Sequence, residues 1–99
     1  QKSIVILHIS VIIIQKLGYP MNTASFFTDL NFSDESVVIT PMLDSDFGKE
    51  IRIAFKSGQV MKEHKTKFPI AVMTLKGSIE FGVGEKMFVL HAGDVITLE

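Results

Sequence analysis

The residue of this sequence that is best suited to chemistry is His64, in the stretch MKEHKTKFPIAVMTLKG that runs from Met61 to Gly77. A neutral imidazole can bind a transition metal or transfer a proton. Glu63 is its neighbour, but successive side chains of a strand point to opposite faces, so Glu63 and His64 form a poor acid–base pair. Catalytic metals usually need about three protein ligands, which a single histidine does not supply.

Three lysines, Lys62, Lys65 and Lys67, flank this histidine. They could attract an anionic ligand such as a sugar phosphate, or they could keep an edge strand from pairing with another chain. We favour the second interpretation. The glycines Gly82 and Gly84 do not indicate a phosphate-binding loop either, because no helix and no Gly-Lys-Ser/Thr motif follows them.

The remaining side chains give little indication of catalysis. The sequence has no cysteine, which excludes a disulfide framework, a thiolate nucleophile and a Cys-ligated metal centre. No Ser-His-Asp arrangement follows from residue spacing. His91 is expected in solvent at a turn, and His8 lies in a strand whose facing is ambiguous, so that it would approach His64 only if it faced inward. We assign no catalytic residue.

Length and composition predict one folded, β-rich domain over residues 1–99, because nearly half of the residues are apolar and Ile, Val and Phe dominate them. Ten basic and eleven acidic residues nearly cancel, so no net charge draws the chain to nucleic acid, and self-association is plausible. The lack of cysteine fits a cytoplasmic protein. The apolar run Ser3–Ile14 is shorter than a membrane span and is broken by His8 and Ser10, so we interpret it as a strand.

Strands separated by turn residues predict an all-β sandwich or barrel with no helix of useful length. Residues 22–36 suggest a brief strand and a loop. Pro41 makes the next strand an edge rather than a centre. Ile51, Ile53 and Phe55 alternate with polar residues and point to one face. The predicted strands and hairpin cover Ser36–Leu43, Lys49–Phe55, Ile70–Gly77, Ser78–Leu90 and Val95–Glu99.

The second half of the chain resembles the small single-domain cupins, whose fold is a double-stranded β-helix or jelly-roll barrel. Their first motif has a glycine, then a histidine, a second histidine, an acid and a closing glycine. At that spacing this sequence has Gly58, His64, Thr66, Ile70 and Gly77, so the frame is kept while two chemical positions are replaced.

The second cupin motif is present only at its start. Gly93 and Asp94 match its opening, but Glu99 stands where a proline is expected, and the last histidine ligand has no counterpart. Residues 1–20 resemble the closing strand of these domains. They are therefore interpreted as an extra or permuted strand segment that fills the closing-strand position, and residues 21–99 as the cupin core.

The resemblance implies a barrel pocket that opens near His64. A divalent metal such as Fe, Mn, Ni or Zn would have His64 as its only candidate ligand there, so no cofactor is expected. The alternative for the inward-facing residues is an ordinary packed core. The predicted pocket residues are His64, Thr66, Ile70, Val72, Thr74, Ile53 and Phe81.

The opposite face of the same strand carries Ala71, Met73 and Leu75, an apolar outer surface that suggests a partner. Cupins commonly pair through such a face, so the resemblance implies a homodimer. We expect a non-enzymatic module that binds a small ligand or has a regulatory role. The alternatives are a divalent-metal-dependent enzyme of the dioxygenase or isomerase type with non-standard ligands, and a purely structural dimer.

Overall fold

Runs of β-branched and aromatic residues form the extended elements of this protein. A computed structural model describes residues 2–10, 22–62 and 67–99. Within these ranges the regular elements are all strands, as the composition predicts, and no helix long and apolar enough to cross a membrane is found among them. The strands are β1 (Lys2–Ser10), β2 (Val38–Ser45), β3 (Gly48–Lys56), β4 (Ile70–Lys76), β5 (Ser78–Val83), β6 (Lys86–His91) and β7 (Val95–Leu98).

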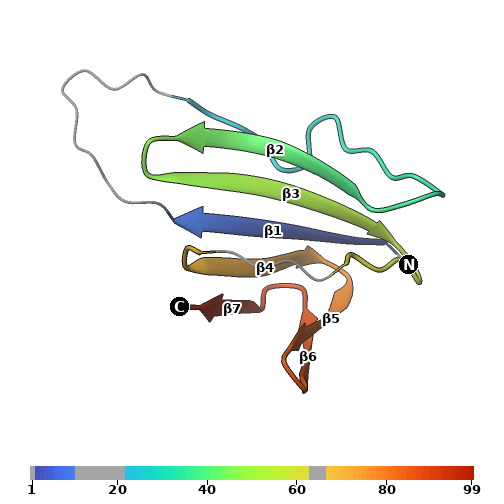
Figure 1. The fold of residues 1–99 in the computed structure, drawn as a ribbon. Coiled ribbons are helices and arrows are strands. Elements are labelled where there is room, and N and C mark those ends of the chain that lie inside the picture. Colours follow the sequence, from blue (N-terminus) through green and yellow to red (C-terminus); the bar gives the residue numbers. More distant parts are fainter. Residues whose placement is uncertain (1, 11–21, 63–66) are drawn as a thin grey trace.

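Five strands form one antiparallel sheet in the order β2-β3-β1-β4-β7, and β5 pairs with β6 in a separate hairpin. Figure 1 shows the hairpin lying across one end of the larger sheet. The N-terminal strand β1 is central, hydrogen-bonded to β3 on one side and to β4 on the other. Strand β2, which contains Pro41, lies at an edge, as predicted.

The inner face of the five-stranded sheet, defined here as the face that meets the hairpin, contains the hydrophobic core. Val5, Ile53 and Val72 come from β1, β3 and β4, and Leu90 from β6 closes over them. Since one face of the sheet packs against a second, two-stranded sheet, the arrangement is compatible with a β-sandwich. Ile51 and Phe55 pack against the same cluster, which confirms the predicted facing of their strand.

The hairpin is held against the sheet by a tight turn at Gly77. Its φ is +73°, a left-handed backbone that glycine adopts without steric cost. A Cβ atom built there would lie 2.5 Å from the Lys2 carbonyl oxygen and 2.5 Å from Ser3 Oγ. The hydroxyl of Ser3 donates a hydrogen bond to the carbonyl of Ser78 (2.9 Å), the first residue of β5. The start of β1 therefore fixes the point at which β4 turns into β5.

The outer face, opposite the hairpin, is covered in part by the segment 26–34. Arg52 is 3% exposed, and its guanidinium donates hydrogen bonds to the carbonyls of Phe26 (3.0 Å), Thr28 (2.8 Å) and Asp29 (3.1 Å). The brief strand predicted within residues 22–36 is wrong, because no strand begins before Val38 in this region. Carbonyl groups of this segment bind the Arg52 side chain instead of a neighbouring strand.

One ion pair also anchors this segment. The ammonium of Lys56 on β3 contacts the carboxylate of Asp34 and, by hydrogen bond and charge, lowers the pKa of that exposed carboxyl below its usual value. Lys2 adds a cation–π contact, with Nζ 4.8 Å from the ring centre of Phe32. The contacts of residues 26–34 thus lie toward the Lys2 end of β1, and His8 and Ser10 lie toward its other end.

Candidate functional site

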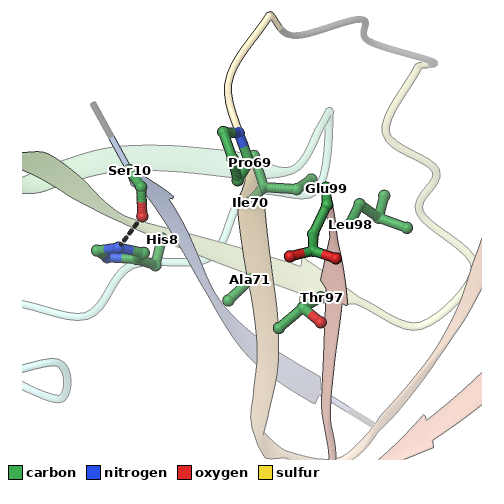
Figure 2. Close-up of a pocket in the computed structure, with 8 residues that line it drawn as sticks. All are labelled: His8, Ser10, Pro69, Ile70, Ala71, Thr97, Leu98 and Glu99. Carbon is green, nitrogen blue, oxygen red and sulfur yellow. Dashed lines mark hydrogen bonds between the residues drawn. The ribbon is translucent and has the colours of Figure 1, made fainter. Parts of the chain in front are cut away.

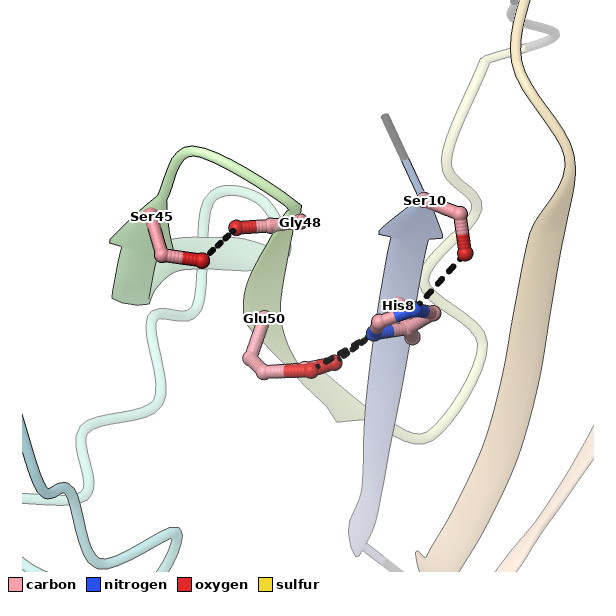
Figure 3. Close-up of polar contacts among 5 residues, drawn as sticks. All are labelled: His8, Ser10, Ser45, Gly48 and Glu50. Carbon is pink, nitrogen blue, oxygen red and sulfur yellow. Dashed lines mark hydrogen bonds and ion pairs between the residues drawn. The ribbon is translucent and has the colours of Figure 1, made fainter. Parts of the chain in front are cut away.

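Three polar side chains meet at the other end of the outer face: His8 and Ser10 from β1, and Glu50 from β3 (Figure 3). His8 Nδ1 lies 2.8 Å from Glu50 Oε2 and also contacts Oε1 of the same carboxylate. His8 Nε2 lies 2.9 Å from Ser10 Oγ. Both ring nitrogens of the histidine are therefore engaged, one by an acid and the other by a hydroxyl.

The strand geometry explains why these residues meet. His8 and Ser10 are two positions apart, so their side chains share a face. The β1–β3 register pairs His8 with Glu50 and Ser10 with Gly48. Gly48 is buried, and a Cβ atom built there would lie 3.1 Å from His8 Cε1, so the absence of a side chain at Gly48 leaves space for the imidazole ring.

The hydrogen bonds select one tautomer for a neutral ring. An ionised carboxylate only accepts hydrogen bonds, so Nδ1 must carry the proton that Glu50 accepts. In the neutral imidazole Nε2 is then an acceptor, and the Ser10 hydroxyl donates to it. The side chains of His8 and Glu50 are 38% and 21% exposed. Solvent and small solutes therefore reach the ring, while its orientation is held from two sides.

A first cleft, of about 220 Å³, lies beside Ser10 and His8 (Figure 2). The strand registers place His8, Ala71 and Thr97 in one row across β1, β4 and β7. Ala71 is the smallest residue of this row, and it lies between the two larger ones. Other lining residues add apolar surface on the far side: Pro69, Ile70 and Leu98, with Glu99 at the rim.

A second cleft, of about 330 Å³, lies on the other side of His8, near the turn between β2 and β3. Its wall is more acidic, and Ser45 is fixed within it by a hydrogen bond from its hydroxyl to the carbonyl of Gly48 (3.1 Å). Asp44 faces Lys49 at 3.9 Å between the charged atoms, where both side chains are exposed. The lining residues are His8, Asn22, Leu43, Asp44, Ser45, Asp46, Phe47, Gly48 and Glu50.

His8 lines both clefts, so a single imidazole lies between a cleft with one acidic residue and a cleft with three. The arrangement supplies a hydroxyl, an imidazole and a carboxylate in one chain of hydrogen bonds. Among the residues that the structure describes, no three His, Cys, Asp or Glu side chains are grouped to hold a metal ion.

The residues predicted to line a pocket separate into four groups. Ile53 and Val72 belong to the hydrophobic core, and Phe81 packs against it. Thr74 is fully buried, and its hydroxyl has no hydrogen-bond partner in the described part of the chain. Ile70 lines the first cleft. His64 and Thr66 lie outside the described residues, so their predicted roles stay predictions.

The predicted dimer face lies on the outer side of β4. Met73 is 39% exposed and pairs with Val95 of β7, which is 57% exposed, so two apolar side chains stand together in solvent. Ala71 instead forms part of the first cleft. Leu75 stands where the β1–β4 register shifts, and it is half-buried.

The sequence indicated only part of this site. His8 was ambiguous in its facing, and the structure places it on the outer face beside Glu50. The spacing of His8 and Ser10 within one apolar run was the available signal. Glu50 is 42 residues further along the chain than His8, and only the strand register shows that the two are opposite each other.

Comparison of the chain with protein-family models, with curated proteins and with solved structures gave no match. Functional inference therefore rests on the sequence and on the geometry described above.

Proposed function

We propose that this chain is a small-ligand-binding or regulatory module of the cupin type, and that its ligand binds around His8. The observation that carries this proposal is the position of His8 on the walls of both clefts, with its ring held by Glu50 and Ser10. Ligand sites combine apolar walls with a few fixed polar groups, and this end of the sheet has both.

The cupin assignment is supported by the motif frame from Gly58 to Gly77 and by the antiparallel two-sheet arrangement. The ligand site proposed here differs from a barrel pocket. Ile53 and Val72 belong to the core, and Ile70 packs against that core and also lines the first cleft. A ligand with a small apolar part against Ile70 and Leu98 and a polar group toward Ser10 fits this lining.

The test is a thermal-shift screen of the purified protein against small carboxylates, amines, alcohols and aromatic compounds. A ligand that binds only the folded state raises the melting temperature, and the shift grows with the logarithm of the ligand concentration once that concentration exceeds the Kd. Ala71→Leu fills the first cleft without touching the core, and we expect it to abolish the shift. Val60→Thr, at a position 83% exposed, is the matched control and keeps it.

Two outcomes would contradict the proposal. A ligand whose shift is unchanged in both Ala71→Leu and His8→Ala binds elsewhere. Stoichiometric Fe, Mn, Ni or Zn in protein purified without chelator, lost in His64→Ala, would support the metal-dependent enzyme instead.

We further propose that the module is a homodimer in which the outer side of β4 forms the interface. Support comes from the exposed pair Met73 and Val95, since paired apolar side chains in water favour burial against a partner. Met73→Glu would place a charge in that interface and should give a monomer by light scattering. Met87→Glu, at a methionine on the hairpin that is 63% exposed, is the control and leaves the mass unchanged. A wild-type protein that is monomeric at about 100 μM would overturn this proposal, because a stable homodimer would be assembled at that concentration.

A further inference from the structure

The geometry points to Ser10 as an activated nucleophile that accepts an acyl group from a small ester bound in the first cleft. The inference uses the same His8 site as the proposed function, but it adds a covalent reaction that reversible binding does not require. It is carried by the chain of contacts from Ser10 Oγ through His8 to Glu50.

A serine hydroxyl is a weak nucleophile unless an adjacent base removes its proton. His8 Nε2 is 2.9 Å from Ser10 Oγ, within the distance at which a general base accepts a proton. Because Nδ1 donates to Glu50, the free lone pair of the ring is on Nε2 and faces the serine. The neutral ring is therefore held in the tautomer that can act as the base.

Glu50 is placed to position the imidazole and to stabilise the imidazolium that forms during the reaction. Its carboxylate is opposite His8 in the β1–β3 ladder and contacts Nδ1 with both oxygens. The same order of groups, hydroxyl to imidazole to carboxylate, carries out serine-based acyl transfer on several unrelated folds, independently of residue order. Glu50 is a positioning residue here, since it reaches the reacting atoms only through His8.

The cleft beside Ser10 indicates the class of substrate. Pro69, Ile70 and Leu98 give it apolar walls, and its volume of about 220 Å³ suits a short acyl chain. Ala71 forms its floor between His8 and Thr97. We therefore infer an ester of a short, uncharged carboxylic acid, with a leaving alcohol directed to solvent.

The reaction balances without any group beyond water. Ser10 Oγ attacks the ester carbonyl carbon and its proton passes to His8 Nε2. The tetrahedral intermediate collapses, the bond to the leaving alcohol breaks, and the proton on Nε2 goes to the departing oxygen. Water then attacks the acyl-serine with His8 again as base, releasing the carboxylic acid and restoring the hydroxyl.

The experiment is covalent labelling of the full chain with an alkyl fluorophosphonate and with p-nitrophenyl butyrate, read by intact mass and by peptide mapping. We expect one adduct on the peptide that contains Ser10. Ser10→Ala should abolish it. Ser57→Ala removes an exposed hydroxyl from the turn after β3, where neither cleft lies, and is the matched control, so its labelling should equal that of the wild type.

The role of His8 as a general base is tested by measurements that an effect on folding would not reproduce. His8→Ala should slow labelling by about 10²-fold or more, the usual contribution of a general base. Added imidazole should restore part of the rate, which a purely structural role of His8 would not produce. Glu50→Gln should slow the reaction less and move the midpoint of its pH profile.

A wild-type protein that stays unlabelled at high reagent concentration would overturn the inference. Equal labelling of wild type and Ser10→Ala would do so too, since the adduct would then be elsewhere. A wild type that shows a ligand-induced thermal shift but no labelling would leave the binding proposal standing while the nucleophile fails. Melting curves of each variant show that it is folded.

Discussion

His8 and Gly48 lie against each other across the β1–β3 ladder, and a Cβ atom at Gly48 would stand 3.1 Å from His8 Cε1 and 3.1 Å from the Ile9 carbonyl oxygen. Gly48→Ala should therefore push the imidazole away from Glu50 and cost about 1–3 kcal/mol, the usual effect of overfilling a packed position. Urea unfolding measures it. Gly82→Ala is the control, because its nearest neighbour is the flexible end of Met87 at 3.5 Å, and we expect little change. Equal effects of the two substitutions would contradict this account.

Glu50 stabilises the folded chain through its hydrogen bond to His8. Glu50→Ala removes a charge-assisted contact at a half-buried position, and we expect a loss of about 1–2 kcal/mol in the free energy of unfolding. Glu80→Ala, at an exposed position of β5, should change it by less than about 0.5 kcal/mol. A Glu50→Ala protein as stable as the wild type would show that the contact contributes nothing to the fold.

Thr74 has a fully buried hydroxyl without a partner among the described residues. Thr74→Val keeps the shape of the side chain and removes the unpaired polar group, so we expect stabilisation of about 1 kcal/mol or more. Thr74→Ser keeps the hydroxyl and loses the methyl, and it should be destabilising. Thermal and urea unfolding should show that Thr74→Val raises the free energy of unfolding and that Thr74→Ser lowers it. A destabilising Thr74→Val would indicate that the hydroxyl has a partner in solution.

Arg52 holds the segment 26–29 against the sheet with three hydrogen bonds to carbonyl groups. Arg52→Ala should release this segment and cost about 3 kcal/mol, because the buried guanidinium and its three hydrogen bonds are lost. Limited proteolysis should then cut near Phe27, which is exposed but held in the wild type. Lys62→Ala, at an exposed position, is the control for loss of a positive charge. Unchanged proteolysis in Arg52→Ala would rule out this anchoring role.

The Lys56–Asp34 pair gives stability a defined pH dependence. Lys56 lowers the pKa of Asp34 below its reference value of 3.8, so the ionised form is favoured in the folded state. The resulting stability is present above the unfolded pKa and is lost as the pH falls through the folded one. Asp34→Asn should therefore lower the melting temperature at neutral pH, and the difference between the two proteins should shrink as the pH falls through the folded pKa of Asp34.

The size of that effect should also depend on salt, because Asp34 is exposed. At about 1 M salt the Debye length is near 3 Å, so the wild type and Asp34→Asn should converge at neutral pH. A difference that persists at about pH 2 or at high salt would show that the residue acts through something other than its charge.

Much of the fold follows from local sequence. The alternation of Ile51, Ile53 and Phe55 predicted their shared face, and Pro41 predicted an edge strand, because both are properties of single strands. The hairpin from Ser78 was predicted from its glycine-containing turn, and its two strands pair as expected. The segment 26–34 was not predictable in this way, since its conformation depends on a buried arginine far along the chain.

In the candidate site, too, some relationships follow from local sequence and others only from the pairing of the strands. The shared face of His8 and Ser10 follows from their spacing within one strand. The position of their partner Glu50 does not follow from spacing, because a one-residue change in register would turn its side chain to the other face. The space for the imidazole depends on Gly48, whose role appears only once β1 and β3 are paired.

The central place of β1 has a consequence for how the protein is made. This strand leaves the ribosome before both of its neighbours, β3 and β4, since they follow it in the chain. Until β3 has been synthesised, an apolar strand that includes Ile4, Val5 and Ile6 has neither of these partners, and until β4 follows one of its edges stays unpaired. Nascent chains in this state are open to association with one another, and the growing polypeptide is most vulnerable to aggregation before residue 76 has been added.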